Sequence, residues 1–274
     1  MSYIAITMRT GAEQFDLLIA QLSELNYEGF EEQTDYLIAY IPEADFEEAA
    51  LQEILGTHGV TYTKETILPV NWNAVWESNF EPVQVDGFCG IRAGFHPPFM
   101  PAPTYEIVIT PKMAFGTGHH ATTTSMIKLM QDINFSGKKV FDFGTGTGIL
   151  AILAEMMGAS AIDAIDYDEW AVNNTAENIT ANQMQKVKVW QADQLDAITG
   201  KYDILLANIN CNILLRFMGD MYSLIVPGGK LLLSGILPTD ETVIVTAAEA
   251  QGFRKERRIE KDNWLALQFA VPLS

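Results

Sequence analysis

KKVFDFGTGTGILAILAEMMGA, residues 138–159, is the stretch of sequence that decides the fold. Its first part, Lys139–Phe143, is apolar and β-prone, and Ile149–Met157 has the composition of a helix that ends at Gly158. Between them, the glycines of GTGTG allow positive φ and let a ligand approach the backbone closely. A strand that runs through such a turn into a helix is typical of open α/β sheets, which bind ligands at the carboxyl ends of their strands.

The chain after this turn alternates strands with helices, which predicts a mostly parallel sheet with helices on both faces. The last two strands have no helix between them, so they should pair antiparallel and make the sheet mixed at one edge. The predicted fold class is therefore α/β, with a mixed seven-stranded sheet. We expect its strands at 139–143, 161–165, 187–190, 202–207, 229–234, 253–259 and 264–271, and helices at 149–157, 169–182, 213–222 and 239–250.

The spacing of the glycines indicates the class of cofactor. Dinucleotide-binding turns follow G-x-G-x-x-G, whereas Gly144, Gly146 and Gly148 follow G-x-G-x-G, and Ile149 occupies the sixth position. Asp142, just before the glycines, suits a cofactor with a positive amino group and a sulfonium better than one with phosphates. The turn therefore favours S-adenosylmethionine over a nicotinamide cofactor.

Carboxylates follow the next two strands of the predicted sheet. Asp166, roughly 20 residues past the glycines, is placed to accept hydrogen bonds from ribose hydroxyls, and Asp168 is expected to cap the following helix. Asp193 is a candidate acceptor for the adenine amine, the alternative being a loop carboxylate in water. Tyr167 either covers one face of adenine or packs at the edge of the core.

Residues 1–69 form a separate predicted module. Their apolar pattern gives the order βαββαβ, which is that of a ferredoxin-like sandwich. We expect strands at 3–8, 27–32, 36–41 and 60–68, and helices at 12–25 and from Pro42 to Gly56. Residues 70–82, rich in Asn and Trp, are predicted to be a linker, and residues 83–274 the second domain.

Charge and composition exclude several function classes. The formal net charge of −18 disfavours strong binding to a phosphate backbone, which needs clustered Lys and Arg, and suits a cationic partner such as a basic protein. Much of the acidic excess lies in the first module, whose Arg and Lys residues are Arg9 and Lys64 alone. Two cysteines, Cys89 and Cys211, make no disulfide framework, and no secretory signal or membrane-spanning run is evident. The cytoplasm is the expected location.

Two further segments carry a resemblance to a known family. They are MAFGTGHHATT, residues 113–123, and LANINCNIL, residues 206–214. Together with DFGTGTGILAI they resemble the bacterial ribosomal protein L11 methyltransferases over nearly the whole chain. The resemblance implies a class I methyltransferase domain that uses S-adenosylmethionine, preceded by a ferredoxin-like domain that recognises the substrate. It also implies methylation of lysine ε-amines and of the N-terminal α-amine of ribosomal protein L11.

The resemblance also points to particular residues. It implies cofactor contacts at Thr123, Gly144, Asp166 and Asn208, and we expect Asn208 to be the catalytic residue as well. The full predicted cofactor site consists of Phe115, Thr123, Asp142, Gly144, Gly146, Asp166, Asp193 and Asn208. The chain departs from the family at Thr110-Pro111-Lys112, where Asp-Pro-Gly is usual, and at Asn210-Cys211, where Leu-Ala is usual.

Other interpretations stay open at this point. His119 and His120 are adjacent, so they point in different directions on a helix, and we predict no metal site. Cys211 lacks an evident His-Asp partner and is expected to be a packing residue rather than a nucleophile. The same fold also serves methyltransferases acting on other proteins, RNA or small molecules. An inactive binding module is disfavoured by the intact glycines, Asp166 and Asn208.

Overall fold

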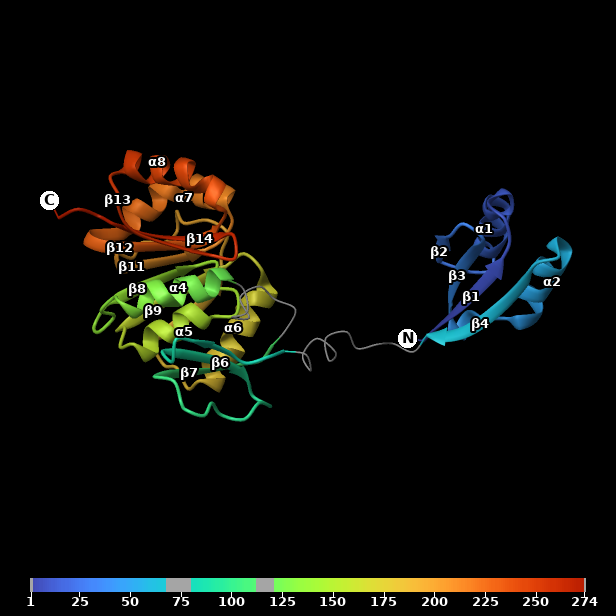
Figure 1. Ribbon diagram of the computed structural model, residues 1–274, viewed down its shortest axis with the longest axis horizontal. Helices are drawn as coiled ribbons and strands as arrows, with labels where there is room; N and C mark the ends of the chain where they lie inside the picture. Colours follow the sequence, from blue (N-terminus) through green and yellow to red (C-terminus); the bar gives the residue numbers. More distant parts are fainter. Residues whose placement is uncertain (1, 68–79, 112–120, 274) are drawn as a thin grey trace. The chain divides into compact units, whose positions relative to one another are not determined.

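The computed structural model describes residues 2–67, 80–111 and 121–273. Contacts within the chain divide it into two compact units, Met1–Val75 and Trp76–Ser274, and each is described by itself. Both units are drawn in Figure 1. Within the described ranges, no helix is long and apolar enough to cross a membrane.

The first unit is a four-stranded antiparallel sheet with its strands in the order β2-β3-β1-β4. Two helices pack on one face, where alternate residues of the central strands, such as Ile6 and Leu37, join Leu18 and Leu55 in a buried cluster. This βαββαβ arrangement confirms the predicted ferredoxin-like sandwich. The elements are β1 (Tyr3–Arg9), α1 (Phe15–Ser23), β2 (Gly29–Glu32), β3 (Tyr36–Pro42), α2 (Glu48–His58) and β4 (Thr61–Ile67), with 3₁₀ turns at Ala12–Gln14 and Glu43–Asp45.

The second helix of this unit was predicted wrongly at both ends. It starts at Glu48, after the 3₁₀ turn, rather than at Pro42, and it continues past Gly56 to His58. The residue that ends it is Gly59, which adopts the left-handed conformation with φ of 65° and donates its N–H to the carbonyl of Gly56. A glycine in a helix is tolerated at modest cost, so composition alone did not show which of the two glycines ends the helix.

The second unit is built on a seven-stranded sheet in the order β10-β9-β8-β11-β12-β14-β13. The five strands from β10 to β12 are parallel, and β14 pairs antiparallel with both β12 and β13, which confirms the predicted mixed edge. The strands are β8 (Lys139–Phe143), β9 (Ala161–Asp166), β10 (Val187–Gln191), β11 (Tyr202–Asn208), β12 (Ile225–Ile236), β13 (Arg254–Lys261) and β14 (Trp264–Ala270). The helices are α4 (Ala121–Gln131), α5 (Ile149–Met156), α6 (Glu169–Ala181), α7 (Cys211–Leu224) and α8 (Glu241–Gln251).

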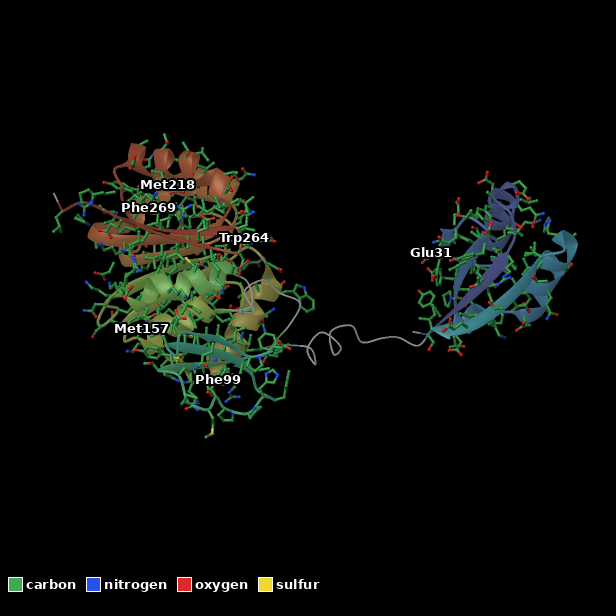
Figure 2. All side chains as sticks on the ribbon, viewed as in Figure 1. Glu31, Phe99, Met157, Met218, Trp264 and Phe269 are labelled. Carbon is green, nitrogen blue, oxygen red and sulfur yellow. The ribbon has the colours of Figure 1, made fainter. Side chains whose placement is uncertain are left out.

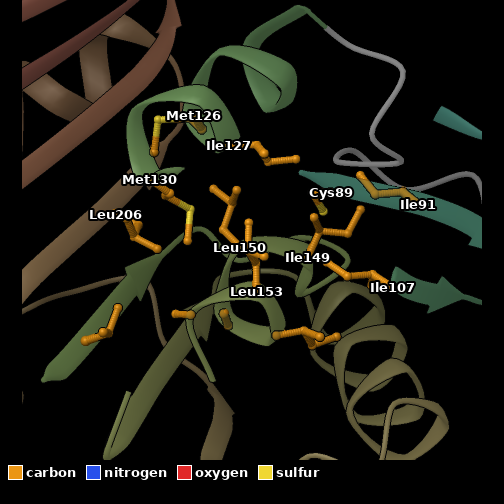
Figure 3. Packing of buried hydrophobic residues seen from close by; sticks show 14 of the residues in the cluster. Cys89, Ile91, Ile107, Met126, Ile127, Met130, Ile149, Leu150, Leu153 and Leu206 are labelled. Carbon is orange, nitrogen blue, oxygen red and sulfur yellow. The ribbon is translucent and has the colours of Figure 1, made fainter. Parts of the chain in front are cut away.

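Successive residues along the strands supply two separate cores, one on each face of the sheet. Val140 belongs to the cluster beneath α4 and α5, whereas Phe141 belongs to the cluster beneath α7 and α8. Figure 3 shows the first cluster, in which Met126 and Met130 of α4 lie near Leu150 of α5. In the second, Met218 and Phe269 are labelled in Figure 2. The sheet is thus covered on both faces, as the sequence predicted.

A small three-stranded sheet precedes α4. It consists of β5 (Val83–Val85), β6 (Cys89–Ala93) and β7 (Tyr105–Ile109). Among the described residues, the free edge of β7 is bonded by asparagines of α6 and by its C-cap residue, Asn182, instead of by a strand. Asn182 bonds both backbone groups of Val108, Asn178 accepts from the N–H of Thr110, and Asn174 donates to its carbonyl. We call these three side chains the asparagine ladder.

Candidate functional site

The glycine-rich turn lies between β8 and α5, and its three glycines have φ of 75°, 60° and 81°. Gly144 has no room for a side chain, because a Cβ there would collide with the side chain of Ile209. The N–H groups of Gly144 and Thr145 donate to the carbonyl of Ile165 at 2.9 and 3.0 Å. The turn is therefore fixed to the end of β9, and only a glycine fits at its first position.

Asp166 extends from the end of β9 into the same turn. Its carboxylate accepts from the N–H of Gly146 at 2.9 Å and from the N–H of Asp168 at 3.1 Å. A carboxylate has about four lone-pair sites, so two acceptor positions remain for ligand hydroxyls. Asp168 caps α6 by accepting from the N–H of Trp170, which confirms the predicted cap.

The opposite side of the turn is held by α6. Thr175 donates its hydroxyl to the carbonyl of Gly146 at 2.7 Å, and Asn178 donates to the carbonyl of Thr147 at 2.8 Å. Both side chains are fully buried. The N–H groups of Gly144, Thr145, Gly146 and Gly148 and the carbonyls of Gly146 and Thr147 are thus bonded before any ligand arrives, which lowers the entropic cost of binding. Sequence reasoning missed both residues, because on a helix of polar composition they resemble solvent-facing positions.

Asp142 is a buried carboxyl group beside the turn, with 1% of its surface exposed. Its Oδ2 accepts from the Thr145 hydroxyl at 2.8 Å, and its Oδ1 forms no hydrogen bond of normal geometry with a described residue. Burial, with a smaller contribution from the charge of the nearby Asp166, raises the pKa of Asp142 to about 7, against the lowering effects of the Thr145 hydroxyl and the backbone of Ala151. The site therefore contains a carboxyl group whose charge a cationic ligand would stabilise.

Asn208 ends β11, next to β8, and is half-buried. The chain then turns through Ile209, whose N–H donates to the carbonyl of Ser234 at 3.1 Å. Asn210 caps α7 by accepting from the N–H of Ile213 at 3.1 Å. The departure from the family pattern at Asn210 therefore has a structural role. Burial and the neighbouring Asp240 raise the pKa of Cys211, which disfavours a nucleophilic thiolate.

The remaining predicted residues differ in how the structure places them, from buried to exposed. Thr123 lies in the first turn of α4, and its buried hydroxyl has no hydrogen-bond partner among the described residues. Asp193 is exposed in the loop after β10, and Tyr167 is 75% exposed. Phe115 lies outside the described residues.

The histidine pair of the AFGTGHH segment, 119 and 120, also falls in the range that the structure does not describe. In the described ranges, no group of three His, Cys, Asp or Glu side chains is placed to hold a metal ion.

A cofactor with hydroxyls and a positive charge fits these groups. The carboxylate of Asp166 has free acceptor positions, and Asp142 needs a cation to ionise fully at neutral pH. The buried Thr123 hydroxyl has no partner in the part of the chain that the structure describes. Gly144 and Gly146 leave their side of the turn without side chains. An extended diphosphate would instead face the charges of two carboxylates.

A sequence model of the family described as ribosomal protein L11 methyltransferase (PrmA) matches residues 7–271. The chain belongs to this family. Among its relatives, the ribosomal protein L11 methyltransferase of Porphyromonas gingivalis is 41% identical over 93% of this chain and 90% of its own. That of Phocaeicola vulgatus is 37% identical over 99% of this chain and 100% of its own.

Solved structures agree with this assignment. The crystal structure of ribosomal protein L11 methylase from Lactobacillus delbrueckii subsp. bulgaricus has a TM-score of 0.65 and 25% identity, covering 70% of this chain and 100% of that one. A putative RNA methyltransferase from Pyrococcus horikoshii has a TM-score of 0.51 and 20% identity, covering 60% and 91%. The second likeness shows a shared fold alone. The predicted family and fold are confirmed, and this member of the family is a methyltransferase.

Proposed function

We propose that this chain transfers methyl groups from S-adenosylmethionine to ribosomal protein L11, on lysine ε-amines and on the N-terminal α-amine. One observation carries the proposal. Asp166 is bonded to the glycine-rich turn through Gly146, and Asn208 ends the second strand along from β9 in the same sheet. Family membership supports the choice of substrate.

The proposed contacts fall into two groups, one at the adenosine end of the cofactor and one at its methionine end. Asp166 accepts from the ribose hydroxyls, and Asp193 accepts from the adenine amine. Gly144 and Gly146 let the cofactor lie against the backbone, while Asp142, Thr123 and Phe115 serve the methionine end. When bound, S-adenosylmethionine supplies a methyl group on a sulfonium that is already a good leaving group.

The protein then has to present an amine with a free lone pair. Lysine in water has a pKa of about 10.4, so the ammonium must lose its proton before it can react. Transfer into a less solvated pocket lowers the pKa of the amine. Beyond that, the side chains contribute alignment, which is worth several kcal/mol.

Asn208 is proposed to accept a hydrogen bond from the amine and so to direct its lone pair. Asn208→Ala should then lower kcat by about 100-fold or more, the loss typical of a missing positioning group. Cofactor affinity, measured by isothermal titration, should change far less than kcat. Normal turnover with weakened cofactor binding alone would contradict this role.

The first unit is proposed to recognise the substrate, with residues 1–69 as the recognition domain, 70–82 as a linker and 83–274 as the methyltransferase domain. The net negative charge of this unit supports the role, because it suits a basic protein partner. It disfavours RNA, since a protein that binds RNA carries clustered Lys and Arg. We also propose the cytoplasm as the location of the reaction, because the proposed substrate is a ribosomal protein.

Mass spectrometry of recombinant ribosomal protein L11, incubated with this enzyme and S-adenosylmethionine, tests the function. Mass gains in steps of one methylene, localised to lysines or to the N-terminus, are the expected result. No gain, with cofactor binding shown separately, would leave a methyltransferase acting on another protein, RNA or a small molecule.

A further inference from the structure

The first unit has a hollow of about 440 Å³, lined by Tyr3, Glu28, Gly29, Tyr40 and Ile67. It lies on the sheet face that α1 and α2 leave uncovered. Ile4 and Ile41 point to the helices and are buried, and their neighbours Tyr3 and Tyr40 point the other way by strand alternation. The hollow therefore has aromatic and aliphatic walls.

Two carboxylates sit beside these walls, and each is held by a tyrosine. Tyr3 donates its hydroxyl to Glu28 at 2.9 Å, and Tyr40 donates to Glu31 at 2.8 Å. The hydrogen bond to Glu28 and its charge raise the pKa of the Tyr3 phenol. Both glutamates are exposed, and Figure 2 shows Glu31 at the surface of the unit. Each carboxylate keeps a second oxygen for another donor.

No cation of the described residues neutralises this pair of carboxylates. Among those residues, no Lys or Arg nitrogen lies within 4.0 Å of either carboxylate. Lys64, the lysine of this unit, pairs with Glu48 instead. Arg9 lies at the far end of β1 from Tyr3, roughly 20 Å away for six residues of strand. Residues 1–67 carry thirteen Asp or Glu and two Lys or Arg, a formal charge of −11 out of −18 for the chain. The negative field of the protein is thus concentrated on the unit that contains the hollow.

We propose that this hollow binds a lysine or arginine side chain of the protein substrate, as an anchor separate from the amine that is methylated. The tyrosine rings and Ile67 pack against the aliphatic stem, and the carboxylate of Glu28 pairs with the charged head. The proposal rests on the proposed function and adds to it the chemistry by which the substrate is held. The tyrosine rings beside the Glu28 carboxylate favour a cation on a long aliphatic stem, which a diffuse acidic surface does not distinguish from other cations.

Glu28→Gln in the full-length enzyme is the direct test, with Glu32→Gln as the matched control. The Glu28→Gln change removes the negative charge and keeps a side-chain oxygen that can accept the hydrogen bond from the Tyr3 hydroxyl. Glu32 ends β2, which begins directly after Glu28, and it is an exposed glutamate like Glu28. It pairs with Leu37, which is buried on the face that the helices cover, so Glu32 belongs to the face opposite the hollow. Steady-state methylation of ribosomal protein L11 should show a KM for L11 about tenfold higher in Glu28→Gln, with kcat retained and the KM for S-adenosylmethionine unaltered. The control should stay within about twofold of the wild type.

A second variant tests the proposal independently, in case Glu28→Gln does not fold normally. Ile67→Lys places a cation of the chain's own on the rim of the hollow, at the exposed end of β4. It should raise the KM for L11 by competing for Glu28, and Glu28→Gln should add little on that background. Equal KM values for Glu28→Gln and Glu32→Gln would overturn the anchor while leaving the function intact. A wild type that does not methylate L11 would overturn both.

Discussion

Replacing Asp142 with Asn should stabilise the methyltransferase unit at neutral and alkaline pH while weakening its hold on a cationic ligand. The carboxyl group is buried, and burial raises its pKa from 3.8 to about 7. Asparagine has nearly the same shape and can still accept the hydrogen bond that Thr145 donates. The substitution therefore removes the cost of a buried charge and little else.

The pH dependence of stability follows from the difference in the pKa of Asp142 between the folded protein and the unfolded chain. Between pH 3.8 and about 7, the folded protein holds a proton on Asp142 that the unfolded chain has lost. The free energy of unfolding of the wild type therefore falls as the pH rises through this window, and it levels off above pH 7. A gap of about 3 pH units corresponds to about 4 kcal/mol, an upper bound for the gain in the Asn variant at pH 8. Below about pH 4 the gain should vanish.

Urea denaturation followed by tryptophan fluorescence measures this difference, because Trp190 and Trp264 lie in the second unit. Curves at pH 5, 6, 7 and 8 should show the variant and the wild type diverging as the pH rises. Titration with S-adenosylmethionine at pH 7.5 should show an affinity about tenfold lower for the variant, because a nearby opposite charge is lost. Parallel stability profiles from pH 5 to pH 8 would refute the reasoning about Asp142.

Three further changes have defined outcomes. Gly144→Ala forces a left-handed conformation and a collision with Ile209, so it should cost about 1–2 kcal/mol for the backbone alone and abolish measurable cofactor binding in isothermal titration. Retained binding would show that the turn can move. Asp168→Ala removes the cap on Trp170 and should lower stability by about 1 kcal/mol in urea denaturation, with kcat nearly unchanged; a large loss of kcat would mean that Asp168 has a direct role. Deletion of residues 1–70 leaves both cores of the second unit complete, so cofactor binding should persist while methylation of L11 disappears. Full activity of the truncated protein would contradict substrate recognition by the first unit.

The parts of the fold that the sequence predicted well are those set by local patterns. The strand before Gly144, the helix after it and the cap at Asp168 depend on neighbouring residues, and all appear in the structure. The absence of a helix between the last two strands was enough to predict that they pair antiparallel at the edge of the sheet. Composition, turn chemistry and periodicity therefore defined the sheet on which the site is built.

The parts that the sequence did not predict depend on contacts between distant segments. Thr175 and Asn178 hold the carbonyls of the glycine-rich turn across 29 and 31 positions, and their spacing on α6 resembles a polar outer face. Ile209 covers Gly144 from another strand end. Asp142 was predicted to suit a cationic cofactor, but its raised pKa follows from a burial that composition does not reveal.

The asparagine ladder has a consequence for the order in which the chain folds. Its hydrogen bonds join residues 64 to 74 positions apart, and a contact of such long sequence separation forms only after a large loop has closed. Among the described strands, the edge strand β7 has no other partner on that side, so the backbone groups on that edge gain their protection when α6 docks and not when β6 pairs with the strand. The amide protons of Val108 and Thr110 should therefore exchange with solvent at the rate at which α6 detaches, and they would report the opening of the helix that also holds the glycine-rich turn.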